Sequence, residues 1–204
     1  MGKDILMQNE VLKPVLLRRL FELACCYGGQ VVSYQKLLGQ LQDSGNVTTL
    51  AHYQSLLSQA LLLKGLDRYT GSAVRQRASS PKWIPLNTAL MTALSSHGPL
   101  SFQPGSPEWG RLVEVAVGAH LVNQNRTSMS VWYWREGGKE VDFVVEKEGH
   151  CLALEVKSGL DDHQSPGMYA FSEKYPGTKM LKIGGDGLPL EMFFEMSPEM
   201  LFHL

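Results

Sequence analysis

Two neighbouring stretches decide the fold of this chain: Glu140-Val141-Asp142-Phe143-Val144-Val145 and Leu152-Ala153-Leu154-Glu155-Val156-Lys157. Both are rich in apolar and β-branched residues, a composition typical of strands that bury their side chains. A buried carboxylate is unfavourable unless it is paired or bound to a metal ion. Asp142, Glu155 and Lys157 are therefore the first candidates for functional residues.

The spacing of these charged residues predicts a single site. Residues two apart in a strand point to the same face and lie roughly 7 Å apart, so Glu155 and Lys157 are expected to be neighbours. Leu154 and Val156 then face the opposite side, into apolar packing. Asp142 lies on the preceding strand, and a tight turn would bring it within reach of Glu155.

Such a set is suited to bind a divalent cation. Mg²⁺, or Mn²⁺ in its place, prefers oxygen ligands and is usually held by one or two carboxylates with water and substrate phosphate. We expect Asp142 and Glu155 to be metal ligands, with the carbonyl of Val156 as a third oxygen. Lys157 would orient a water molecule, help to deprotonate it, or neutralise charge on the phosphate under attack.

Glu114 is the fourth candidate catalytic residue and an auxiliary metal ligand. It lies among valines in the helix that is expected to precede the strands. A carboxylate on that helix would reach the metal directly or through water. The alternative is an exposed glutamate without a role.

The second half of the chain is predicted to contain helices and strands in the order α-β-β-β-α-β. The expected elements are a helix over 108–124, strands over 131–136, 139–146 and 150–157, a helix over 167–174 and a strand over 179–183. This order, with its charged set, resembles that of PD-(D/E)xK nucleases. The resemblance implies a restriction-endonuclease-like α/β domain with a mixed sheet over residues 96–204.

The first half is expected to contain helices followed by a hairpin. The helices are predicted over 15–26 and 34–41, and a third, capped by Thr48 or Thr49, runs to Ala60. Strands over 61–69 and 82–86 would form the hairpin, and a short helix over 87–95 would follow. This pattern predicts an N-terminal winged helix-turn-helix segment, with its connecting helix, over residues 1–95.

Basic residues gather on the predicted wing. Arg68, Arg75, Arg77 and Lys82 are suited to contact DNA phosphates, although a solvated loop without a ligand is an equal alternative. The net charge is +5 for residues 1–100 and −6 for residues 101–204. That asymmetry fits a half that binds phosphate, and it also fits ordinary variation of surface charge.

Other patterns restrict the class of protein. We expect no membrane span and no signal peptide, because no apolar stretch approaches the required length. Three cysteines, of which Cys25 and Cys26 are adjacent, indicate no disulfide framework and a reducing cytoplasm. The segment Gly184-Gly185-Asp186-Gly187 lacks the Lys-Ser/Thr of a phosphate-binding loop and is interpreted as a turn, so no nucleotide cofactor is expected. Tyr133-Trp134-Arg135 and His52 could touch nucleic acid, but core packing and solvent exposure are equal alternatives.

The chain resembles the C-terminal region of bacterial and archaeal AAA+-type ATPases, a domain of unknown function that follows the ATPase module. The matching stretches include Ser80-Pro81-Lys82-Trp83, Arg111-Leu112-Val113-Glu114, Tyr133-Trp134-Arg135, Glu140-Val141-Asp142-Phe143 and Leu154-Glu155-Val156-Lys157-Ser158-Gly159. The resemblance implies a winged-helix-like segment before a nuclease-like domain, and an ATPase module upstream. The chain departs from the family at Asn87, where an Asp is usual, and it contains no Walker motifs.

Three functions follow as hypotheses from these patterns. The first is Mg²⁺-dependent hydrolysis of DNA phosphodiester bonds. The second is a non-catalytic module that binds DNA or protein and keeps the nuclease scaffold, because folds outlast activities. The third is a regulatory domain that communicates partner recognition to an ATPase.

Overall fold

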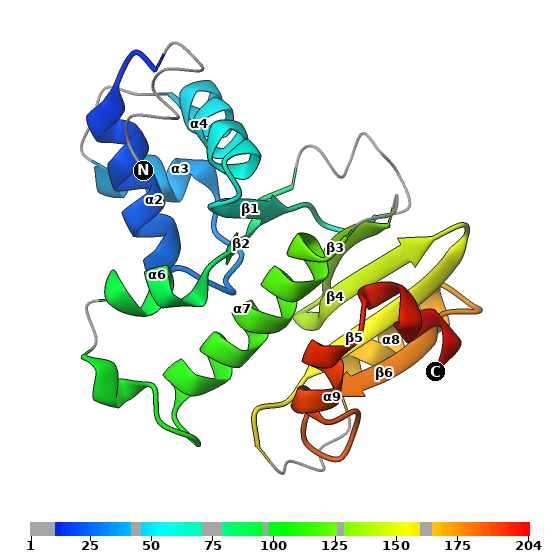
Figure 1. Cartoon of the computed structure of the whole chain (residues 1–204). Coiled ribbons are helices and arrows are strands. Elements are labelled where there is room, and N and C mark those ends of the chain that lie inside the picture. The colour runs from blue at the N-terminus through cyan, green and yellow to red at the C-terminus, as the bar shows by residue number, and fades with distance from the viewer. Residues whose placement is uncertain (1–10, 42–45, 71–78, 96–97, 126–128, 160–164) are drawn as a thin grey trace.

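The chain forms a mixed α/β structure in the computed structural model, which describes residues 11–41, 46–70, 79–95, 98–125, 129–159 and 165–204 (Figure 1). A four-stranded mixed sheet is joined to a helical part that ends in a small two-stranded antiparallel sheet. Within the described residues, no helix is both long and apolar enough to cross a membrane.

Three helices and a hairpin are found in the described residues of the first part. They are α2 (Pro14–Cys26), α3 (Tyr34–Leu41), α4 (Val47–Gln59), β1 (Leu63–Leu66) and β2 (Lys82–Pro85). The expectation that Thr48 or Thr49 caps α4 is wrong, because the helix starts earlier. Asn46 is the N-cap, and its side-chain oxygen accepts the backbone N–H of Thr49 at 2.8 Å.

Strand β2 contributes to two hydrophobic cores. Trp83 is fully buried with Leu20, Leu50 and other residues of the three helices. Ile84, the next residue, is fully buried with α7 and the large sheet. Successive side chains of a strand point to opposite faces, so one short strand joins both cores. The helix α6 (Thr88–Ala93) follows, and Asn87 caps it by accepting the N–H of Ala89.

The second part follows the α-β-β-β-α-β order predicted from the sequence. Its elements are α7 (Pro107–Asn123), β3 (Ser130–Glu136), β4 (Lys139–Lys147), β5 (His150–Val156), α8 (Pro166–Lys174) and β6 (Lys179–Ile183). The spatial order is β3-β4-β5-β6. The first three strands are antiparallel, and β6 pairs with β5 in parallel after the crossover through α8.

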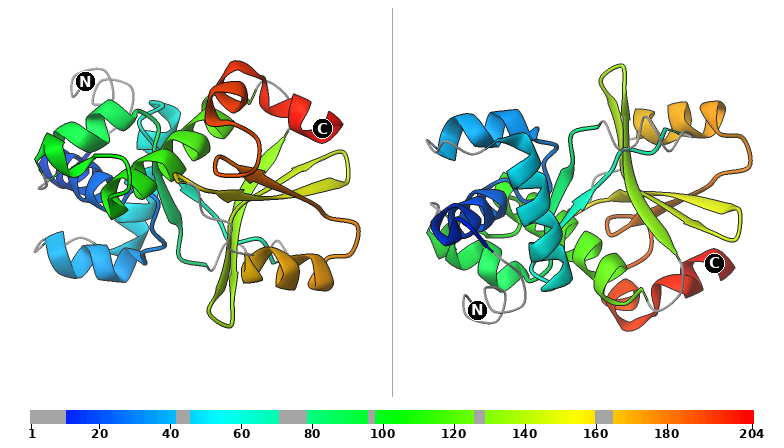
Figure 2. Two further views of the ribbon diagram at one scale, coloured as in Figure 1. Left: turned by 90° about the horizontal axis from the view of Figure 1, so that it is seen from below. Right: turned by 90° about the horizontal axis from the view of Figure 1, so that it is seen from above.

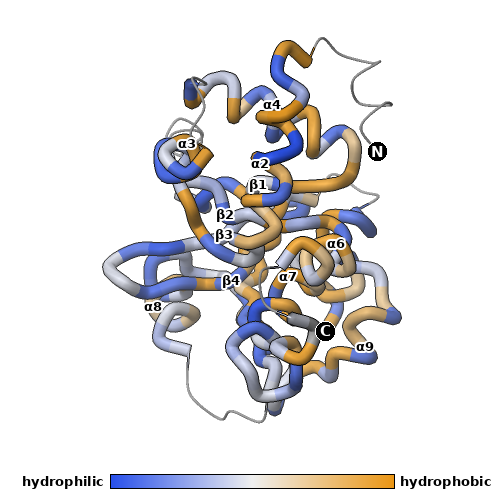
Figure 3. The backbone as a smooth tube through the Cα atoms, turned by 90° about the vertical axis from the view of Figure 1, so that its left-hand side faces the viewer, coloured by the Kyte–Doolittle hydropathy of each residue, from blue (hydrophilic) through white to orange (hydrophobic). Residues whose placement is uncertain are grey.

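Helices cover both faces of this sheet, with α7 on one face and α8 on the other (Figure 2). Val115 of α7 packs with Phe143 and Leu154. Phe171 of α8 packs with Val144 on the other face. In Figure 3 apolar residues gather around α6 and α7. The candidate site residues of β4 and β5 are therefore held between two packed faces of the sheet.

The chain after β6 was not predicted to be helical. It forms α9 (Leu190–Glu195) and a 3-10 helix η2 (Pro198–His203), and a further 3-10 turn, η1, spans Pro99–Ser101. Phe193 and Leu201 are both fully buried in the core on the α7 face of the sheet. This segment therefore completes the cover of that face.

A β-bulge interrupts the pairing of β3 and β4. Trp132 pairs with Val144, but Trp134 pairs with Val141, so two residues of β4 lie opposite Tyr133. The two are Asp142 and Phe143. A bulge bends the strand and redirects a side chain, and here the residue affected is the predicted metal ligand.

Candidate functional site

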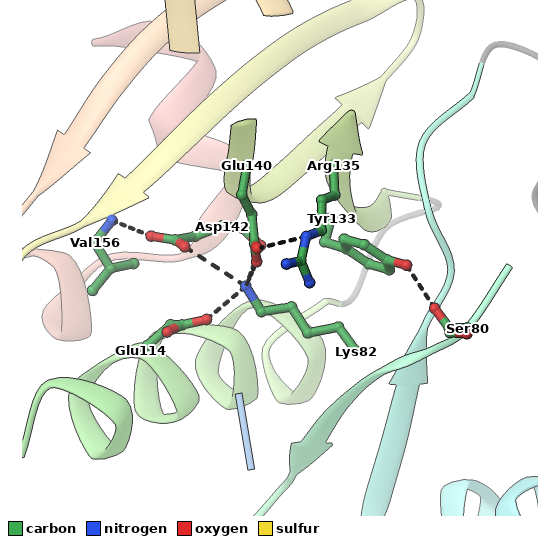
Figure 4. Close-up of polar contacts among 8 residues, drawn as sticks. All are labelled: Ser80, Lys82, Glu114, Tyr133, Arg135, Glu140, Asp142 and Val156. Atoms are coloured by element: carbon green, nitrogen blue, oxygen red, sulfur yellow. Dashed lines mark hydrogen bonds and ion pairs between the residues drawn. The ribbon is translucent and has the colours of Figure 1, made fainter. Parts of the chain in front are cut away.

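The ammonium of Lys82 is the centre of a cluster of carboxylates (Figure 4). Its Nζ lies 2.6 Å from Oε1 of Glu114, 3.2 Å from Oε1 of Glu140 and 3.6 Å from Oδ1 of Asp142. It also donates to the backbone carbonyl of Asp142 at 3.2 Å. The side chain of Lys82 is fully buried. A lysine from the hairpin thus neutralises acids from α7 and β4.

Burial and the neighbouring charges shift the pKa values of the residues in this cluster. Burial alone would lower the pKa of Lys82, but the negative charges of Glu114, Asp142 and Glu140 raise it well above its ordinary value. Burial raises the pKa of Glu114 to about 7, against the lowering effect of Lys82 and with a further rise from Asp142. Lys82 is therefore a cation at neutral pH, whereas burial favours the protonated form of Glu114.

Asp142 lies where the ladder between β4 and β5 ends. The last paired residues are Phe143 and Leu154, and the backbone N–H of Val156 donates instead to Oδ2 of Asp142 at 2.9 Å. One carboxylate oxygen thus faces β5 and the other faces Lys82 (Figure 4). The Asp142 carboxylate links the cluster around Lys82 to the end of β5.

Glu155 and Lys157 are neighbours, as the spacing of the strand predicted. The Nζ of Lys157 lies 3.2 Å from Oε1 of Glu155. Leu154 and Val156 pack into the core on the α7 face, which bears out the expected alternation. Burial raises the pKa of Glu155, and the charge of Asp142 raises it further, while Lys157 opposes the shift. The two carboxylates therefore repel each other across the strands.

A cleft of about 460 Å³ opens beside these residues. It is lined by Gly29, Gln30, Val31, Glu114, Arg135, Glu140, Asp142 and Glu155. The loop after α2 forms one wall, and Val31 bridges to Lys82 in the strand behind it. Glu114, Asp142 and Glu155 are thus brought to one cleft from three different elements.

The basic residues assigned to the wing differ in their burial and in their contacts. Lys82, expected to contact phosphate, is instead fully buried, because its ammonium is needed among three carboxylates. Arg68 is half-buried, and its backbone N–H donates to Oγ of Ser79. Arg75 and Arg77 lie outside the described residues. The assignment of phosphate contacts to these two remains a prediction.

The aromatic residues near the site belong to the core. Tyr133 and Trp134 are buried, and the hydroxyl of Tyr133 donates to the carbonyl of Ser80 at 2.6 Å. Arg135 is exposed at the rim, 3.7 Å from Oε2 of Glu140. His52 lies exposed on α4, away from these residues in the sequence.

Two features of the site were missed from the sequence. Glu140 was not assigned a role, although it is the second carboxylate on Lys82. The burial of Lys82 was also missed. The apolar residues Trp83 and Ile84 come directly after Lys82, and both are fully buried. They could have indicated a buried lysine, because a lysine in such a strand needs a partner.

Two carboxylates at the end of β5 could bind a hard divalent cation. Asp142 and Glu155 offer carboxylate oxygens there, and their mutual repulsion reflects negative charge that a cation would neutralise. In the part of the chain that the structure describes, no three His, Cys, Asp or Glu side chains are grouped to hold a metal ion by themselves. Any such ion would therefore need backbone, water or substrate oxygens in addition.

Comparison with known families divides the chain at nearly the same place as the fold. Residues 109–187 match the model of a domain of unknown function (DUF4143). Residues 1–101 match that of a second domain of unknown function (DUF8612). No curated protein and no solved structure matches the chain. The first match contains Glu114, Asp142, Glu155 and Lys157, whereas Lys82 falls within the second.

Proposed function

We propose that this chain is the nuclease-like region of an AAA+-type ATPase and that it hydrolyses DNA phosphodiester bonds with a divalent cation. The observation that carries the proposal is the shared cleft of Asp142 and Glu155, with Lys157 paired to Glu155. Metal-assisted hydrolysis can use two carboxylates as metal ligands and a lysine beside them to orient the attacking water.

Each residue has a distinct role in this proposal. Asp142, Glu155 and the carbonyl of Val156 would hold Mg²⁺ or Mn²⁺, which supplies Lewis-acid chemistry when bound. Lys157 would orient the attacking water and stabilise the negative charge that develops on the phosphate. The bond between Asp142 and the N–H of Val156 fixes the direction of the aspartate before any ligand arrives.

The first test is cleavage of DNA with Mg²⁺ or Mn²⁺ by variants of the site. Asp142→Ala and Lys157→Ala should each abolish cleavage. Lys179→Ala is the matched control, because Lys179 is exposed at the opposite end of β6 and should leave cleavage unchanged. Equal cleavage by the wild type and both site variants would reveal a contaminating nuclease and refute the proposal.

The wing is proposed to bind the DNA backbone through Arg75 and Arg77. Each lost phosphate contact should flatten the plot of log affinity against log salt concentration by about 0.9. The double variant Arg75→Ala, Arg77→Ala is therefore expected to bind DNA with a flatter salt dependence than the wild type. An unchanged slope would exclude these two residues from the interface.

A second candidate function is a non-catalytic module that binds DNA or protein. The observation in its favour is the pairing of Glu114, Glu140 and Asp142 with Lys82, which leaves these acids less in need of a metal. Calorimetric titration with Mn²⁺ separates the two functions. Absence of binding at millimolar concentration would favour the module, and a saturable site would favour the hydrolase.

The link to an ATPase comes from the resemblance of the sequence. In that arrangement the chain would report DNA or protein recognition to the ATPase module, whether or not it cuts. A Walker A motif in the reading frame upstream of this sequence would support the link. Co-purification of the two regions with nucleotide-dependent DNA binding would test it directly.

A further inference from the structure

Lys82 is bound as completely as a side-chain ammonium can be. An ammonium has three N–H donors, and three acceptors lie within hydrogen-bond distance of this one: Glu114 Oε1, Glu140 Oε1 and the backbone carbonyl of Asp142. A fourth oxygen, Oδ1 of Asp142, lies 3.6 Å away. The ammonium is therefore surrounded by oxygen atoms in the manner of a bound cation.

The position of this ammonium is fixed by the fold. Lys82 belongs to β2, in which every residue is buried, and its Nζ lies 5.1 Å from the ring centroid of Phe143. Its neighbours Trp83 and Ile84 each anchor the strand in a different core. The backbone that carries the ammonium is therefore held in both cores, and the side chain itself is fully buried. Lys82 is thus a constant component of the site.

The charges around the cleft leave room for one further cation. Four carboxylates, on Glu114, Glu140, Asp142 and Glu155, face the cations of Lys82, Lys157 and Arg135. Lys82 lies on the side of the Asp142 carboxylate that faces α7. Glu155 lies on the side that faces β5, and it is paired with Lys157 at the end of that strand. These three cations leave one net negative charge on the four carboxylates, and a divalent cation between Asp142 and Glu155 would more than offset it.

We infer that Lys82 is a resident cation that takes the place of a second metal ion, so that the site accepts a single divalent cation at Asp142 and Glu155. Glu114 then positions Lys82 and does not bind the metal, because its carboxylate lies with the ammonium, 2.6 Å from it, on the side of Asp142 that faces α7 and not on the side that faces β5. This inference rests in part on the proposed function. It adds the number of metal ions and assigns Lys82 and Glu114 as positioning residues.

The experiment counts Mn²⁺ ions by titration calorimetry and by electron paramagnetic resonance of the free ion. The wild type should bind one Mn²⁺, and Lys82→Met should bind two, because three carboxylates lose their cation. The double variant Lys82→Met, Glu114→Gln should return to one. A lysine with a merely structural role would not raise the count, so one ion in folded Lys82→Met would overturn the inference.

Two further variants keep the test decisive if Lys82→Met does not fold. Glu114→Gln nearly preserves shape and should leave the affinity of the single Mn²⁺ within about tenfold of the wild type, whereas Glu155→Gln should lose it. A loss with Glu114→Gln as large as with Glu155→Gln would show that Glu114 is a direct ligand. If the wild type binds no Mn²⁺ but Lys82→Met gains an ion, the proposed hydrolase and the single metal site at Asp142 and Glu155 are both refuted, and only the replacement of a metal ion by Lys82 is supported.

Discussion

Replacing Gly167 with alanine should force α8 away from β4. Gly167 is the second residue of that helix, and a Cβ built on it would lie 1.7 Å from the carbonyl oxygen of Glu140. Real Cβ atoms do not approach other atoms within 3.0 Å, so the two backbones must separate by more than about 1 Å. The neighbouring atom is backbone, which cannot turn aside as a flexible side chain can.

The expected loss of stability follows from what α8 buries. Overpacking a well-packed contact costs about 1–3 kcal/mol, and a helix that moves away also weakens the packing of Phe171, which is fully buried against Trp134. Alanine returns at most about 1 kcal/mol through its better helix propensity. We therefore expect Gly167→Ala to lower the free energy of unfolding by about 2 kcal/mol.

Urea unfolding followed by tryptophan fluorescence would measure this change. The matched control is Gly39→Ala in α3, where a new Cβ meets nothing within 4 Å. That variant should be more stable by about 0.5–1 kcal/mol, because alanine is the better helix former. A Gly167→Ala protein as stable as the control would refute the close approach of α8 to β4.

Three smaller predictions concern stability. The free energy of unfolding should fall by up to about 3 kcal/mol as the pH rises from 4.5 to 7.5. Folded Glu114 has a pKa of about 7, whereas in the unfolded chain its pKa returns to the ordinary value of 4.5, so over this range only the folded protein keeps the proton. Urea titrations across this range should show a flatter dependence for Glu114→Gln, and an equal one would contradict the raised pKa. Ser106→Ala should cost about 1 kcal/mol in thermal unfolding, since Oγ of Ser106 caps α7 by accepting the N–H of Trp109; Ser106→Asp should restore most of it. Lys174→Ala removes an exposed ion pair with Glu136 and should change stability by less than about 1 kcal/mol in a double-mutant cycle.

Much of the fold was predictable because the sequence is locally consistent. The helix Tyr34–Leu41 and the strand Lys179–Ile183 have the predicted bounds. The alternation of Leu152, Leu154 and Val156 with Ala153 and Glu155 marks a strand that is packed on both faces. Local patterns of this kind depend on side chains a few residues apart, and tertiary contacts reinforce them here.

The parts that escaped prediction depend on distant contacts. In the sequence, Lys82 lies next to the predicted wing, far from Glu114 and Glu140. Only the fold brings these two carboxylates to its ammonium. The bulge at Asp142 is set by the pairing with β3, which no local pattern encodes. The helix α9 is six residues long, too short for a periodic signal, and its order comes from the burial of Phe193.

The double attachment of β2 has a consequence for how the molecule loses its structure. Trp83 and Ile84 cannot leave one core without disturbing the other. One family match ends at residue 101 and the other begins at residue 109, yet the contacts between the two matched regions include a fully buried charge on Lys82. Separate melting of the two matched regions would leave that charge and its carboxylates unpaired. Hydrogen exchange should therefore find the amides of β2, α2 and α7 opening together, as one cooperative unit.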